Sequence, residues 1–171
     1  MMNIHKYLFL MGSKIRNPHL IKYYQFLKKS ESWNRKQLHQ YQIESCRKLL
    51  IFARDHSPFW RQRLKEQQLV PENFTSLDQL KSLKSIKKEE LLKHNDAIHT
   101  QYHFKKSFFC ETSGSTGQPL SFWRNEEWDS FNRASIMRGY SWFNIRPWER
   151  NGYLWGYSFH KDEFGLLVNT E

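Results

Sequence analysis

One short segment of the chain combines glycines with hydroxyl side chains in a way that suits binding of a polyphosphate. It reads Thr112-Ser113-Gly114-Ser115-Thr116-Gly117-Gln118-Pro119. Gly114 and Gly117 permit positive φ angles and close approach of the backbone to an anion. Successive N–H groups in such a turn form an anion-binding concavity, and Ser113, Ser115 and Thr116 add hydroxyl donors. The segment predicts a phosphate-binding loop, although the same residue types also favour an ordinary hairpin turn.

The elements expected around this loop are two strands and a helix. Residues 107–111 are short, aromatic and bounded by turn residues, and residues 120–123 alternate like a returning strand. The absence of a Gly-Lys-Ser/Thr sequence and the strand expected after the loop exclude the P-loop of NTPases. Asn125 can cap a helix whose first turn holds Glu126 and Glu127, the charge preferred at that end. We expect one side of this helix to carry five aligned side chains. They are Trp128, Phe131, Ser135, Arg138 and Trp142.

The segment before residue 107 is predicted to be helical. Apolar residues recur at helical spacing from Trp33 to about Arg54. Ser57 and Pro58 suit the cap and first position of the next helix. The capping box Ser76-Leu77-Asp78-Gln79 starts a short helix at Leu77, and residues 87–94 form another. The apolar run of residues 7–11 is too short to span a bilayer and lacks a signal-peptide cleavage site, so we interpret it as a frayed or packed terminus.

The second half of the chain is rich in aromatic residues, which make up 16% of the whole. We expect this half to supply core or pocket, and residues 153–157 to form a third strand. The order of elements favours an α/β fold, with a helical region over residues 1–106 and the beginning of a mixed sheet over residues 107–171. A sheet of so few strands would leave an open edge and an uncovered face, which suggests a truncated domain.

The loop closely resembles the signature loop of the adenylate-forming superfamily, which includes acyl-CoA synthetases, luciferases and the adenylation domains of peptide synthetases. The usual form there is Thr-Ser-Gly-Ser/Thr-Thr-Gly-Lys-Pro-Lys. Gln118 and Leu120 replace its two lysines, and both replacements remove a cation that could meet phosphate.

Segments on both sides of the loop resemble the phenylacetate–CoA ligase branch, and most nearly the CapK-like proteins linked with capsular polysaccharide genes. His56-Ser57-Pro58-Phe59-Trp60-Arg61 is similar to its H-x-P-F-Y-R segment, and residues 76–91 are similar to the stretch that follows. Residues 133–156 look like the helix, turn and strand after the loop. Glu149 and Arg150 keep only the acid–Arg ending of the usual Gly-x-x-x-Gly-Asp-Arg turn. The resemblance covers roughly residues 33–160.

The resemblance implies an ATP-dependent, Mg²⁺-requiring ligase that activates a small-molecule carboxylate as an acyl-adenylate. Coenzyme A is the acceptor in many members, and a role in capsular or exopolysaccharide biosynthesis follows from the CapK-like branch. The ATP phosphates would lie against Thr112, Ser113, Gly114, Ser115, Thr116 and Gly117. The acyl pocket would begin at Gly156, Tyr157 and Ser158, and Tyr157 is equally expected as a core strand residue.

The resemblance assigns no catalytic residue and no metal ligand to these 171 residues. The adenine-binding segment, the ribose-binding aspartate and the C-terminal lysine of the family have no counterpart in the sequence. We therefore expect the N-terminal part of such an enzyme, inactive by itself, in the cytoplasm. The expected partners are ATP and the carboxylate, with no nucleic acid or membrane partner and a homodimer as an option for the full-length enzyme.

Charge leaves a second class of function open. Residues 1–110 hold 21 Lys+Arg and 9 Asp+Glu, net +12, whereas residues 111–171 hold 6 and 8, net −2. Dispersed solvated helix faces explain this excess, but a basic module that binds nucleic acid or a membrane surface is an alternative. A remnant that has inherited its loop without using it is a third interpretation.

Metal and redox chemistry find little support in the sequence. His94, His99 and His103 lie near one another, but no carboxylate or cysteine set completes a site, so we interpret them as surface residues. Cys46 and Cys110 are far apart and form no CxxC pair, which fits a reduced compartment.

Overall fold

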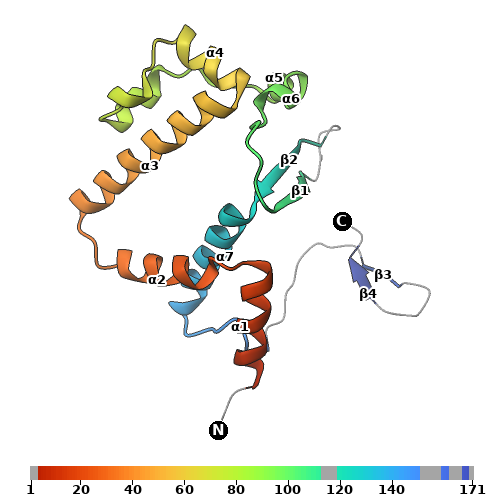
Figure 1. The fold of residues 1–171 in the computed structure, drawn as a ribbon. Coiled ribbons are helices and arrows are strands. Elements are labelled where there is room, and N and C mark those ends of the chain that lie inside the picture. The colour runs from red at the N-terminus through yellow and green to blue at the C-terminus, as the bar shows by residue number, and fades with distance from the viewer. Residues whose placement is uncertain (1–3, 113–118, 151–158, 162–166, 170–171) are drawn as a thin grey trace.

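A computed structural model describes residues 4–112, 119–150, 159–161 and 167–169. This part of the chain is mostly helical, with two small antiparallel hairpins (Figure 1). That content is compatible with an α/β class. The predicted strand over residues 153–157 lies outside the described residues.

Seven α-helices and two 3₁₀ helices occupy most of the described residues. Their bounds are α1 Ile4–Arg16, α2 Leu20–Ser30, α3 Arg35–His56, α4 Pro58–Glu66, η1 Pro71–Asn73, η2 Leu77–Ser82, α5 Lys88–Lys93, α6 Asn95–Ile98 and α7 Glu126–Ser141. The strands are β1 Ser107–Glu111, β2 Ser121–Asn125, β3 Phe159–Lys161 and β4 Leu167–Asn169. Strand β1 pairs with β2 and β3 with β4, both antiparallel.

The helix starts predicted from Ser57 and Ser76 are confirmed, because each depends on a local hydrogen bond; the cap of α3 at Asn34 was not predicted. Asn34 caps α3 with a complete capping box, and the Ser57 hydroxyl accepts from the Trp60 N–H at the start of α4. Ser76 caps η2, again with a capping box. Helix α2 begins without a side-chain cap at His19, and the sequence pattern did not delimit α1 or α2. The run of residues 7–11, interpreted as a frayed or packed terminus, lies within α1.

Two separate hydrophobic cores hold these helices together. In the α3–α4 core, Ile43 and Leu50 of α3 pack with three residues from α4 and the segment after it, namely Leu64, Leu69 and Phe74. In the α2–α7 core, Leu20 and Leu27 pack against Ala134 and Met137. Helix α3 connects the α4 end of the molecule to the end that holds α2 and α7 (Figure 1).

The buried side of α7 carries few large apolar residues. Asp129, Ser130, Ala134 and Met137 are buried, because α2 packs against this face. The five side chains expected to line up on one side of α7 include Trp128 and Trp142, which are 49% and 61% exposed. Helix α7 has few large apolar residues, so periodicity alone could not identify the covered face.

Several aromatic side chains in the second half, which we expected to supply core or pocket, are exposed. They include Phe109, Trp123, Trp142 and Phe143. In the described part of the chain, aromatic residues therefore lie at the surface as well as in the interior.

Candidate functional site

The predicted loop connects β1 to β2, the two strands of an antiparallel hairpin. The Cα register pairs Ser107 with Asn125 and Glu111 with Ser121. The predicted first strand is confirmed over residues 107–111, and the second runs two residues further than predicted. A loop that joins neighbouring antiparallel strands must reverse the chain at the end of the hairpin.

Two hydrogen bonds close the neck of this loop. The Thr112 N–H donates to the Leu120 carbonyl at 3.0 Å, and the Leu120 N–H donates to the Thr112 hydroxyl oxygen at 2.9 Å. Thr112 therefore holds the two strand ends together at the start of the loop. The other predicted phosphate-binding residues, from Ser113 to Gly117, lie outside the described residues, as do Gly156, Tyr157 and Ser158.

The base of the hairpin passes directly into α7. The Asn125 side-chain oxygen accepts from the Trp128 N–H at 2.7 Å, and the Glu126 N–H donates to the Lys106 carbonyl at 3.1 Å. The first turn of α7 also carries Glu126, Glu127 and Asp129. Because three carboxylates already meet the positive end of the helix dipole, this helix terminus is unsuited to a phosphate.

A buried carboxylate ties α7 to the connection between α1 and α2. Asp129 is 2% exposed and accepts from Arg133 Nε and Asn17 Nδ2, each at 2.8 Å. Arg124 lies 3.7 Å from its other oxygen. Burial tends to raise the pKa of Asp129, but these hydrogen bonds and the arginine charges outweigh burial, so its pKa lies below the usual value.

Two further acidic residues of α7 make contacts with α2 and with His19, the residue just before α2. Glu126 pairs with His19 Nδ1 at 2.6 Å and accepts from the Ser130 hydroxyl. Burial opposes ionisation of Glu126, yet the bonds from Ser130 and His19 hold its pKa below the usual value. Tyr23 donates to Glu127, and burial together with this carboxylate raises the pKa of Tyr23. The acidic first turn of α7 is therefore committed to structure.

A cavity of about 330 Å³ lies along the flank of the hairpin. It is lined by Asn95, Asp96 and His99 of the α6 region and by residues of both strands, including Phe109 and Trp123. The Phe109 and Trp123 rings meet edge to face at 5.3 Å. This wall offers ring surface and a few polar atoms beside the loop, which suits a planar group attached to a bound anion.

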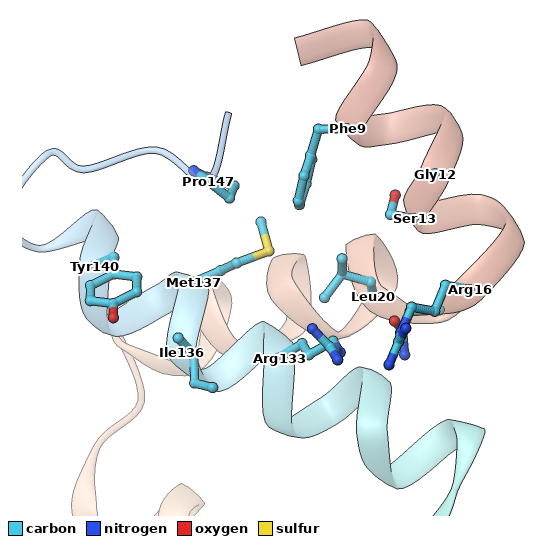
Figure 2. Close-up of a pocket in the computed structure, with 11 residues that line it drawn as sticks. Phe9, Gly12, Ser13, Arg16, Leu20, Arg133, Ile136, Met137, Tyr140 and Pro147 are labelled. Atoms are coloured by element: carbon cyan, nitrogen blue, oxygen red, sulfur yellow. The ribbon is translucent and has the colours of Figure 1, made fainter. Parts of the chain in front are cut away.

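A second hollow, of about 420 Å³, lies between α1 and α7 (Figure 2). Leu20, Ile136 and Met137 supply apolar surface, and Arg16 and Arg133 stand at one end. Arg133 is the residue that binds Asp129. Thr112, the one predicted site residue among those the structure describes, does not line this hollow.

The histidines considered as metal ligands are not brought together with a ligand set. His99 Nδ1 bonds the Asn95 carbonyl at 2.7 Å, and the His94 ring packs 5.8 Å from Phe59. No group of three or more potential ligands was found among the described residues. Within the same part of the chain, no helix has both the length and the apolar character needed to cross a membrane.

Sequence reasoning missed the interactions of Asn17, Asp129 and Arg133. The i,i+4 spacing of Asp129 and Arg133 was the one available signal, but it is equally common on solvated helix surfaces.

Comparison of the chain with models of protein families and with curated proteins found no match.

Proposed function

We propose that the hairpin loop Thr112–Pro119 binds the β- and γ-phosphates of Mg-ATP, as part of a ligase that activates a carboxylate by adenylation. The supporting observation is a Gly/Ser/Thr segment at the closed end of an antiparallel hairpin, with its neck bonded between Thr112 and Leu120. Two strands held in register fix the ends of the loop, so that its N–H groups can converge on one anion.

Backbone and hydroxyl donors would carry most of this binding. Gln118 and Leu120 stand where the resembling loops have lysines, and the Leu120 N–H is used in the neck. The remaining donors are the amides from Ser113 to Gly117 and their hydroxyl groups. A Mg²⁺ ion bound with the nucleotide would neutralise part of the phosphate charge that a lysine otherwise meets.

In the proposed reaction, a carboxylate oxygen attacks the α-phosphorus of ATP. The new O–P bond forms as the bond from the α-phosphorus to the bridging oxygen breaks, and pyrophosphate leaves with that electron pair. The loop would hold the leaving pyrophosphate in line, so its contribution is positioning and charge stabilisation. A coenzyme A thiol would then attack the acyl carbon and form a thioester as the bond from that carbon to the AMP oxygen breaks. AMP leaves with that electron pair, and the thiol proton is released to solvent.

Binding tests this proposal better than turnover, because the resemblance places no catalytic residue in this chain. We expect Mg-ATP and inorganic tripolyphosphate to bind the chain in calorimetric titrations. Gly117→Val should weaken both at least about tenfold, because a branched side chain blocks close approach of the phosphate.

Gly139→Val is the matched control for this variant. A Cβ at Gly139 meets nothing within 4 Å, and this residue of α7 lies outside the hairpin. It should bind as the unmodified chain does. Equal affinity of Gly117→Val and the unmodified chain for both ligands would refute the loop assignment.

A second candidate is a basic surface for single-stranded nucleic acid. Arginines stack over exposed aromatics at two places, Arg124 over Trp128 and Arg138 over Trp142, at 5.4 and 5.5 Å. Such pairs can stack bases and meet phosphates. Binding of an oligothymidylate that weakens steeply with salt, and persists in Gly117→Val, would favour this function.

A further inference from the structure

Helix α1 presents its most apolar side to solvent. Ile4, Leu8, Met11 and Ile15 are 63%, 60%, 64% and 80% exposed. Their spacing of four, three and four residues places them in one line along the helix. We call these four residues the α1 stripe. Tyr7, 53% exposed, lies at its edge.

The opposite side of α1 already faces the rest of the molecule. Phe9 packs 6.0 Å from the Trp148 ring, and Ser13 is buried. Figure 2 shows Phe9, Ser13 and Arg16 directed from α1 toward the hollow beside α7. The α1 stripe is therefore a second apolar surface of the same helix, because the first is used in folding.

The stretch of sequence that contains the α1 stripe carries charge of a single sign. Residues 1–30 contain six basic residues and no Asp or Glu. The basic residues are Lys6, Lys14, Arg16, Lys22, Lys28 and Lys29. Lys14 is exposed beside Ile15 in the last turn of α1, whereas Arg16 is directed to the hollow and lies 5.5 Å over the Phe108 ring. The carboxylates of α7 that face this region are held by Arg133, His19 and Tyr23.

We propose that α1 lies on the surface of an anionic phospholipid bilayer, with the α1 stripe in the boundary between headgroups and acyl chains. A helix of 13 residues is about 20 Å long, too short to span the bilayer but suited to lie along it. Lys14, which is exposed beside Ile15, would meet lipid phosphates. Apolar contact and charge are both needed, and this combination favours an anionic bilayer over a second, equally basic copy of the chain.

This inference goes beyond the proposed nucleotide site and departs from the expectation of no membrane partner. It does not depend on the loop. The two proposals can therefore fail separately, and Gly117→Val should bind vesicles like the unmodified chain.

Sedimentation with vesicles tests the proposal. We expect the chain to bind vesicles of phosphatidylglycerol and phosphatidylcholine much more strongly than vesicles of phosphatidylcholine alone. Leu8→Glu should lower the partition coefficient at least about tenfold, because it replaces an apolar side chain that would enter the bilayer with a charged one. Lys14→Gln should lower it about fivefold on anionic vesicles.

Leu49→Glu is the matched control, since Leu49 is 65% exposed on α3, outside the α1 stripe. It introduces the same charge and should bind vesicles nearly as the unmodified chain does. Circular dichroism should show the same helical content in all variants.

Three results would overturn the proposal. The first is equal binding to both kinds of vesicle, or to neither. The second is an equal loss for Leu8→Glu and Leu49→Glu. The third is dimerisation in solution that Leu8→Glu abolishes, without vesicle binding by the unmodified chain.

Discussion

Replacing Asp129 by asparagine should destabilise the fold by about 3 kcal/mol. Asp129 is 2% exposed and accepts from Arg133 and Asn17 at 2.8 Å, with Arg124 at 3.7 Å. Asparagine keeps one acceptor oxygen and no charge. Loss of one partner of a buried pair costs about 3–5 kcal/mol. The Arg133 side chain is 43% exposed and can be rehydrated, which places the effect at the lower end.

Urea denaturation followed by circular dichroism measures this loss. A loss of 3 kcal/mol corresponds to a fall of about 10 °C in Tm for a chain of this size. The control is Asp78→Asn, whose partner Lys81 lies at 2.6 Å but where both side chains are at least 78% exposed. We expect the control to change stability by less than about 0.5 kcal/mol, because exposed pairs contribute little.

The pH dependence of the same variant gives a second test. The pKa of Asp129 lies below its usual value in the folded chain. An unfolded aspartate has a pKa of about 3.9, so the unfolded state takes up the proton first as the pH falls. The stability from this carboxylate is present above about pH 4 and is lost as the pH drops through the folded pKa.

The difference between the unmodified chain and Asp129→Asn should therefore shrink below about pH 4. A difference under about 1 kcal/mol at neutral pH would refute the assigned role of the buried carboxylate. A difference that stays constant down to about pH 2 would show that ionisation of Asp129 is not its source.

Two further predictions concern the start of α7 and the α3–α4 core. Asn125→Ala should lower the free energy of unfolding by about 1 kcal/mol, because the Trp128 N–H loses the side-chain oxygen that caps it. Asn125→Ser should retain most of the stability, since serine can also cap a helix. Equal losses for the two variants in urea denaturation would contradict the capping role. Phe74→Ala should cost about 3–5 kcal/mol, since Phe74 is fully buried against Leu64 and its neighbours. A loss below about 1 kcal/mol in the same assay would show that this core is loosely packed.

Features that depend on neighbouring residues were predictable from the sequence. Ser57, Ser76 and Asn125 each bond an N–H two or three residues away, so the cap can be recognised in a short window. The hairpin on either side of the loop could be predicted for a similar reason, because short aromatic strands flank a segment rich in turn residues.

Features that depend on distant residues were not predictable. Tyr23 lies 104 positions before Glu127, and Asn17 lies 112 before Asp129. Nothing local in α7 indicates that Ser130 and Ala134 are buried while Trp128 is exposed. The packing of α2 against α7 decides this, and helical periodicity cannot show which helix supplies the cover.

The sequence by itself determined the loop Thr112–Pro119, the two strands that flank it and the capped helix that follows, since turns, strands and caps arise from short-range backbone preferences. The resemblance to adenylate-forming enzymes, and with it the proposed ATP site, also comes from the sequence. Only the tertiary structure decided that Asp129 is a buried link between α7 and the α1–α2 connection, and that the apolar α1 stripe faces solvent. Burial is a property of distant segments brought together, so it is settled when the helices pack.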